Sequence, residues 1–231
     1  MKLKTLAISI GLAFVAQVSS ACGFYEIAGA DNNGWKNDDC DIRVIARETG
    51  VRLVYNAKKD FYHIEVNNGI NIFSVDVIEK YLKDAGEYMG TVHNKAISVY
   101  LNSPGGSAWQ GIRLNKLFQG RRNDQPWAVS ARVIKGQVCA SACAVAFTGA
   151  LYRSISHTGL LKFHAPYTTS DLGVKRCNTD PTSDINAALL TAYKKTLGVD
   201  KGNRLFKETN KCKPNANLVT YNQHNSKWFQ N

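Results

Sequence analysis

The segment from Ala96 to Pro166 contains three short apolar runs, and each is followed directly by a turn marked by glycine, serine or histidine. The three stretches read AISVYLNSPGGSAW, ARVIKGQVCASACAVAF and GLLKFHAP. A strand, a tight turn and a helix in this order can set an exposed serine, a backbone anion hole and a histidine at the ends of neighbouring strands. These groups are the minimum set for nucleophilic acyl transfer, so the segment predicts where a reactive centre lies.

The first turn carries a glycine pair, Gly105 and Gly106, between a strand predicted over 96–101 and a helix that contains Gly111, Leu114 and Phe118. Two glycines that open a helix leave backbone N–H groups free and place no side chain in front of them. This pattern favours an anion site. The alternative is that the pair only makes a tight turn.

The second turn places Ser141 between Ala140 and Ala142, ahead of another apolar helix. Small neighbours permit the strained strand-to-helix turn of a nucleophile elbow, which lifts the hydroxyl outward while the N–H of Ala142 points into the same space. The alternative for such a serine is a helix cap.

The third turn begins at His164, after a strand predicted over 159–163. Open α/β sheets place their chemistry at such strand ends. A lone histidine there is more often a buried structural residue, but beside an elbow serine it is favoured as a general base.

The N-terminal 21 residues have the pattern of a secretory signal peptide: Lys2 and Lys4, an apolar run over 6–18 and small residues before Cys22. The apolar run is too short to span a bilayer comfortably, and no later run approaches the required length. The sequence therefore predicts a periplasmic or secreted protein without a transmembrane segment. Cleavage would leave Cys22 first, but the polar Ser19 disfavours a lipoprotein anchor at that cysteine.

Export makes disulfides the expected state of the six cysteines. We expect one bridge between Cys22 and Cys40 and one between Cys177 and Cys212. Two further cysteines, 139 and 143, flank Ser141 at equal distance, and they form either a bridge or two buried thiols. The spacings resemble no zinc site, so no metal or other cofactor is expected.

Length and charge restrict the remaining possibilities. A chain of 231 residues that is 44% hydrophobic can build the core of one domain, here 51–231, after an irregular arm over 22–50. The formal net charge is +11 at pH 7, but the basic residues are scattered, so a solvated surface is expected and no nucleic-acid partner. No P-loop is present, and no ATPase partner is implied.

Taken together, LNSPGGSAWQG, CASACAVAFTGA and KFHAP resemble the Clp protease proteolytic subunit family, and more closely its exported bacterial relatives in the crotonase superfamily. The resemblance covers residues 61–197. It implies an α/β, crotonase-like fold of ββα repeats, with a helix over 183–197 that carries subunit contacts in homo-oligomers. It also implies Ser141 as nucleophile, His164 as general base, and the N–H groups of Gly106 and Ala142 as the oxyanion hole.

The sequence departs from the family at the third triad member. The family has an aspartate well beyond the histidine, whereas no aspartate follows Asp200 here. Asn210 is the candidate substitute, because its amide could orient His164 by hydrogen bonding; Glu208 and Asp200 are less well placed. The resemblance thus implies an exported serine peptidase-like protein that hydrolyses peptide bonds through a Ser-His acyl-enzyme. The alternative is an inactive member that binds a peptide or protein partner.

Overall fold

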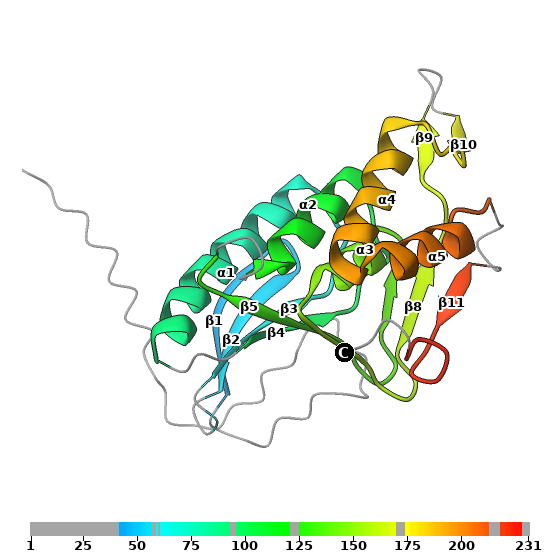
Figure 1. The fold of residues 1–231 in the computed structure, drawn as a ribbon. Coiled ribbons are helices and arrows are strands. Elements are labelled where there is room, and N and C mark those ends of the chain that lie inside the picture. The colour runs from blue at the N-terminus through cyan, green and yellow to red at the C-terminus, as the bar shows by residue number, and fades with distance from the viewer. Residues whose placement is uncertain are drawn as a thin grey trace, which may run out of the picture.

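The computed structural model describes residues 42–56, 59, 61–92, 96–120, 125–169, 174–212 and 218–227. Its elements, drawn in Figure 1, are β1 (Ile42–Glu48), β2 (Val51–Asn56), β3 (Phe61–Val66), α1 (Ile72–Val92), β4 (Ala96–Leu101), α2 (Ala108–Phe118), β5 (Ala128–Val133), β6 (Val138–Ala140), α3 (Ala142–Gly149), β7 (Tyr152–Ile155), β8 (Leu160–Phe163), β9 (Tyr167–Thr169), β10 (Lys175–Cys177), α4 (Asp184–Leu197), α5 (Val199–Thr209) and β11 (Val219–Tyr221). Three consecutive strands precede α1 and two precede α3, whereas α2 follows the single strand β4.

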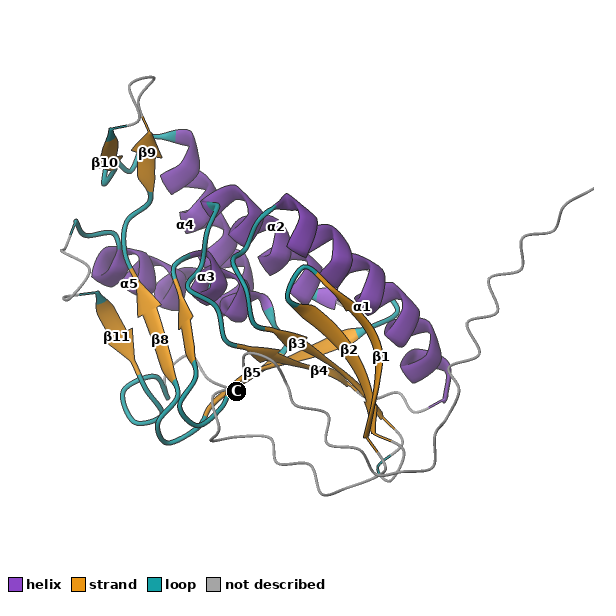
Figure 2. Cartoon of the chain, turned by 180° about the vertical axis from the view of Figure 1, so that it is seen from behind, coloured by secondary structure: helices purple, strands orange, loops and turns teal. Residues whose placement is uncertain are grey.

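The larger sheet has the strand order β1-β2-β3-β4-β5-β7. Its first three strands are antiparallel, and β3, β4, β5 and β7 run parallel. Alternate residues such as Ile64, Val99 and Val129 are fully buried, and the helices α1 and α2 cover one face of this sheet (Figure 2). The core therefore lies between this face and the helices.

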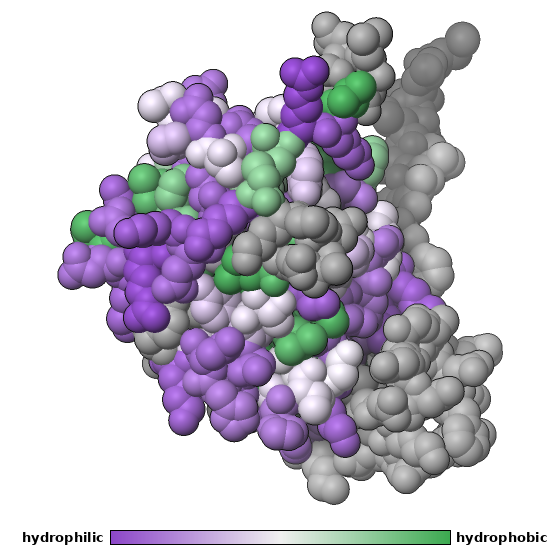
Figure 3. All heavy atoms as spheres, turned by 90° about the vertical axis from the view of Figure 1, so that its right-hand side faces the viewer, coloured by the Kyte–Doolittle hydropathy of each residue, from purple (hydrophilic) through white to green (hydrophobic). Residues whose placement is uncertain are grey.

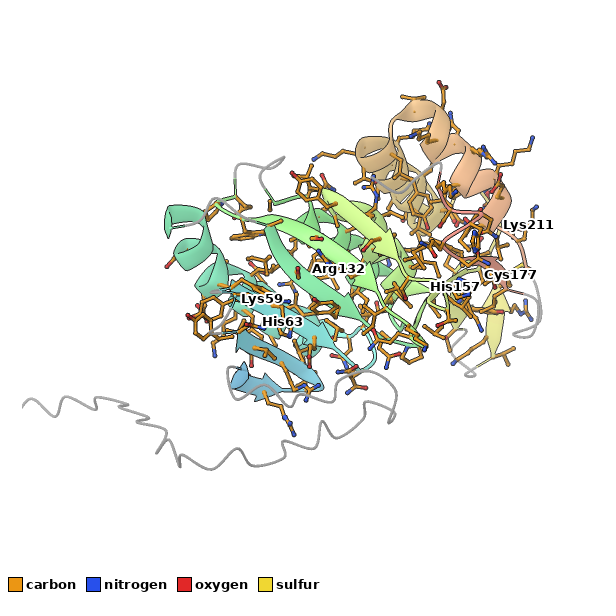
Figure 4. All side chains as sticks on the ribbon, turned by 90° about the horizontal axis from the view of Figure 1, so that it is seen from below. Lys59, His63, Arg132, His157, Cys177 and Lys211 are labelled. Atoms are coloured by element: carbon orange, nitrogen blue, oxygen red, sulfur yellow. A yellow bond between two sulfur atoms is a disulfide. The ribbon has the colours of Figure 1, made fainter. Side chains whose placement is uncertain are left out.

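The opposite face of the same sheet is polar, and Figure 4 views it with His63 and Arg132 labelled. Glu65 forms a buried ion pair with Arg52 and lies 3.3 Å from His63 Nε2. Burial of the guanidinium lowers the pKa of Arg52, and its pairing with Glu65 offsets part of that cost.

A second sheet has the order β11-β8-β6, with β6 parallel and β11 antiparallel to β8. The two sheets meet where the loop after β4 lies against β6. There Ser103 N donates to Val138 O at 2.8 Å, and Ala140 N donates to Ser103 O at 2.9 Å. The glycine turn after β4 is therefore joined to the strand that carries Ser141.

Close contact between α2 and α3 fixes the start of α3. A Cβ added at Gly111 would lie 2.7 Å from Ala142 O, so only glycine lets the two backbones approach this closely. Buried Asn115 of α2 donates to Val145 O at 3.0 Å and to Thr148 Oγ1 at 2.9 Å, which joins the two helices again further along.

The predicted helix over 183–197 is confirmed as α4, with Ser183 at its N-cap and Gly198, at φ 86°, at its C-cap. The Ser183 hydroxyl donates to Asp180 O at 2.8 Å and makes no capping bond to the helix. α5 follows at once and presents exposed Lys201 and Lys207 to solvent. Figure 3 views the molecule from this side, where the surface is mostly hydrophilic with separate small apolar patches.

The N-terminal arm predicted over 22–50 includes residues that pair in the sheet, because β1 aligns antiparallel to β2. The signal peptide, Cys22 and Cys40 lie outside the described residues. No helix in the described part of the chain is both long and apolar enough to cross a membrane.

The predicted bridge between Cys177 and Cys212 is confirmed, with a Cα–Cα distance of 5.7 Å. It ties β10 to the chain after α5, and Figure 4 places Cys177 and Lys211 at the same end of the molecule.

We predict that Cys177→Ala/Cys212→Ala lowers the free energy of unfolding. The bridge spans a sequence separation of 35, and a loop of that length corresponds to a loss of about 4 kcal/mol in the chain-entropy model. Urea unfolding, extrapolated to water with the m-value of each variant, measures the loss. A decrease below about 1 kcal/mol would show that the loop is ordered without the bridge.

Candidate active site

Ser141 joins β6 to α3 in a strained conformation. Among the described residues other than glycine, only Thr49 and Ser141 have a positive φ, and Ser141 has φ 54° and ψ −122°. This backbone region costs a non-glycine residue about 1–3 kcal/mol, so the surrounding contacts must hold it. Ser141 stands at the N-cap of α3 but makes no side-chain capping bond. Its conformation fits the elbow interpretation and does not fit a helix cap.

The neighbouring strand fixes the position of the elbow. In the parallel register Ala140 pairs with Lys162, and Ser141 N donates to Lys162 O at 2.7 Å. His164 follows two residues after Lys162, where β8 has ended. The second sheet therefore brings the predicted nucleophile and the predicted base to the ends of adjacent strands.

The glycine turn packs directly on Ser141. A Cβ at Gly105 would lie 2.6 Å from Ser141 Cβ and 3.0 Å from Ala142 N, and the φ of Gly105 is +94°. Ile70 anchors this turn, because its N–H donates to Gly105 O at 2.7 Å and its carbonyl accepts from Ser107 N at 2.9 Å. The contact requires glycine at position 105.

Two backbone donors remain beside Ser141. Gly105 N donates to Ser103 Oγ at 3.1 Å, whereas Gly106 N has no hydrogen-bond partner among the described residues. Ala142 N is the first N–H of α3, which has no intrahelical acceptor, and no side chain caps this end. Neither of the two donors that the sequence predicts for an oxyanion hole is therefore hydrogen-bonded within the described residues.

His164 is half-buried, and a backbone carbonyl fixes its tautomer. Nδ1 lies 2.6 Å from Ala165 O, which can only accept, so Nδ1 carries the proton and Nε2 has the lone pair. The ring also lies 5.3 Å from that of Tyr167, between centroids. No hydrogen bond joins Ser141 and His164 in the described part of the chain; such bonds often tighten only when substrate binds.

Asn210 lies near this site without a bond to His164. Its Nδ2 donates to Thr179 O at 3.1 Å, and its Oδ1 is buried without a hydrogen-bond partner. Ala165 N donates to Lys211 O at 3.3 Å, which brings the chain after α5 alongside the histidine turn. Asn210 as the third member stays a prediction.

Of the two other acids considered, Glu208 is hydrogen-bonded to other side chains and Asp200 is exposed. Glu208 accepts hydrogen bonds from Tyr221 and Arg204, and although burial opposes its ionisation, these bonds lower the pKa of Glu208. Asp200 is exposed in the first turn of α5. Neither carboxylate is hydrogen-bonded to His164 in the described part of the chain.

The two cysteines that flank the elbow form a disulfide, Cys139–Cys143, and both are fully buried. This resolves the two alternatives that the sequence left for them. The described residues contain no group of three His, Cys, Asp or Glu side chains that could hold a metal ion. The site thus offers a serine, a histidine and backbone donors.

A cavity of about 340 Å³ lies on the polar face of the larger sheet, away from the elbow. It is lined by Ala96, Ser98, Ser130, Arg132, Tyr152, Arg153 and Ser154. The residues that line it include no histidine, although His63 on β3 pairs in register with Ser98.

Sequence reasoning missed Ala165 O as the acceptor for His164. Every residue, proline included, carries a backbone carbonyl, so the residue type gives no signal. Sequence reasoning also missed Ile70 as the anchor of the glycine turn. Its position after the Asn67-Asn68-Gly69 turn was the available signal, but the contact with Gly105 depends on the pairing of β3 with β4.

No family model matches this sequence, and no curated protein does. Among solved structures, a mutant of ClpP1 from Listeria monocytogenes is similar, with a TM-score of 0.50. The similarity covers 73% of this chain and 86% of that one, at 14% sequence identity. The chain has a ClpP-like fold. At this identity the likeness concerns the fold alone, and the roles of individual residues depend on the geometry above.

We predict that Gly105→Ala abolishes reaction of Ser141 with a fluorophosphonate, because the new methyl group would collide with Ser141 Cβ and with Ala140 O at 2.5 Å. Gly198→Ala is the matched control: its φ is +86°, but nothing lies within 4 Å of the added Cβ. Both variants carry backbone strain, and only the first disturbs the site. Equal labelling of the two variants would contradict the contact between the glycine turn and the elbow.

Proposed function

We propose that the protein is an exported serine peptidase that cleaves peptide bonds through an acyl-enzyme at Ser141. The observation that carries this proposal is the positive φ of Ser141 at a strand-to-helix turn, followed directly by the uncapped N–H of Ala142 at the start of α3. A strained serine of this kind persists only where its surroundings hold it, and such positions gather at active sites.

The proposed reaction uses Ser141, His164 and the two backbone donors. His164 Nε2 takes the proton of Ser141 Oγ as the oxygen attacks the scissile carbonyl carbon. The carbonyl oxygen becomes an oxyanion and accepts hydrogen bonds from the N–H groups of Gly106 and Ala142. The C–N bond then breaks, and His164 gives the proton to the leaving amine. Water, deprotonated by His164, then attacks the ester carbonyl carbon. The bond between this carbon and Ser141 Oγ breaks to release the carboxylic acid, and His164 gives its proton to Ser141 Oγ.

The acceptor for His164 Nδ1–H is a backbone carbonyl, whereas a serine-histidine-aspartate triad has a carboxylate at this place. Ala165 O holds the Nδ1–H tautomer that the mechanism needs, but a neutral carbonyl does not counter the charge of the imidazolium. Asn210 is the proposed third member, supported by its buried, unpaired Oδ1. Neither acceptor is anionic, so we expect turnover to be slower than with a buried aspartate.

The fold and the sequence together support a substrate class and a cellular location. A ClpP-like fold supports a peptide or protein substrate and assembly into homo-oligomers. The lysine-bearing apolar N-terminus and the two disulfides support export to the periplasm or the medium.

A second candidate function is peptide or protein binding without turnover. The neutral acceptor at His164 Nδ1 and the absence of a bond between His164 and Ser141 among the described residues favour it. The two candidates differ in whether Ser141 becomes covalently modified.

We expect a fluorophosphonate to label the mature protein at Ser141, with no labelling of Ser141→Ala. His164→Ala should react about 100-fold or more slowly, since general-base catalysis contributes roughly that much. Ser154→Ala, which removes an exposed serine on β7, is the control and should react like wild type. Mass spectrometry locates the adduct. Equal labelling of wild type and Ser141→Ala would refute the peptidase, and an unlabelled wild type would favour the binding function.

For Asn210→Ala we predict a decrease in labelling rate that is smaller than that of His164→Ala, because Ala165 O still holds the ring. Asn210→Asp tests the same position with a charged acceptor and should react faster than wild type. A rate unaffected by both substitutions would remove Asn210 from the site.

A further inference from the structure

The disulfide Cys139–Cys143 encloses the nucleophile. Cys139 belongs to β6 and Cys143 to α3, and their Cα atoms are 5.2 Å apart on either side of Ser141. Both cysteines have no exposed surface, so the bridge lies inside the core beneath the elbow. It links the strand that enters the turn to the helix that leaves it.

Loop-closure entropy accounts for little stabilisation of the fold by this bridge. The stabilisation expected from a disulfide grows with the length of the loop it closes. Cys139 and Cys143 have a sequence separation of only 4, against 35 for Cys177 and Cys212. The short bridge therefore restricts the unfolded chain far less than the long one, and its main effect is on the local geometry of the turn.

The two sides of the elbow are held differently. On the entering side, Ala140 N donates to Ser103 O and Ser141 N donates to Lys162 O. On the leaving side, the start of α3 packs against Gly111 and Val145 N donates to Ser141 O, but no side chain caps the helix. The bridge from Cys143 back to Cys139 ties this uncapped end to β6.

Because the positive φ of Ser141 costs free energy, relaxation of the turn would be favourable. Returning φ from 54° to a negative value would swing the Ser141 side chain and rotate the peptide that carries Ala142 N. Both the attacking oxygen and one oxyanion donor would move away from Gly106. A link between residues 139 and 143 opposes this rotation, because it fixes the distance between the two ends of the turn.

We propose that the Cys139–Cys143 disulfide is a positioning element for acylation, which holds Ser141 Oγ and Ala142 N in register with the glycine turn. The proposal rests on the function proposed for Ser141. The bridge touches neither substrate nor reacting atoms; it acts through the conformation of the elbow. Its removal should lower reactivity more than it lowers stability.

The test compares Cys139→Ala/Cys143→Ala with two controls. Cys177→Ala/Cys212→Ala removes the longer bridge, and Val129→Ala removes core packing in the first half of β5, away from the elbow. The second-order rate of fluorophosphonate labelling is measured against pH at a temperature where every variant is folded, together with the melting temperature. The two measurements separate a positioning role from a general loss of stability.

We expect the 139/143 variant to lose about tenfold or more of the labelling rate, since small displacements of a nucleophile have effects of this size. Its melting temperature should fall less than that of the 177/212 variant. The pH midpoint of labelling should stay at the wild-type value, because the surroundings of His164 are unchanged. Val129→Ala should lose melting temperature but retain the wild-type rate.

Two results would overturn the proposal while leaving the peptidase intact: a labelling rate of the 139/143 variant within twofold of wild type, or an equal loss in Val129→Ala. Absence of labelling in wild type would instead refute the function itself, and the proposal with it. If the double alanine variant does not fold, Cys139→Ser/Cys143→Ser, which also lacks the bridge but stays close to cysteine in side-chain volume, takes its place. Its labelling rate must fall in the same way.

Discussion

The parallel pairing of β6 with β8 is the interaction on which the candidate site depends. Its register sets Ala140 beside Lys162, so that Ser141 and His164 follow at the ends of two neighbouring strands. A shift of one residue in this register would turn alternate side chains to the opposite face and separate the two groups. The hydrogen bond from Ser141 N to Lys162 O extends the pairing one residue beyond β6, into the strained turn itself.

The larger sheet contributes the remaining part of the site mainly through backbone contacts. Ser103 connects the end of β4 to β6, Gly105 packs on Ser141, and Ile70 holds the glycine turn from the other side. Backbone groups have fixed positions relative to their strands, which suits donors that must be in place before charge develops. The site thus combines side chains from one sheet with donors held by both.

The sequence predicted those parts of the structure that have a local pattern. Strands β4 and β8 lie where the apolar residues indicated, and Ser183 and Gly198 mark the ends of α4. The three-residue strands β6, β9, β10 and β11 are too short for any periodicity, and their existence depends on partners distant in sequence. The acceptor for His164 escaped prediction for a related reason: it is the carbonyl of the next residue, and residue types do not reveal where a carbonyl points.

The contacts that build the site also determine when it can form during folding. Ile70 meets Gly106, Ser103 meets Cys139, and Ser141 meets Lys162, so each contact closes a loop of many residues. Loop closure of this kind is slow relative to helix formation, and these contacts do not form independently within one supersecondary unit. A chain emerging from synthesis therefore cannot complete the site before β8 is present, because Lys162 O accepts the bond from Ser141 N and His164 follows that strand.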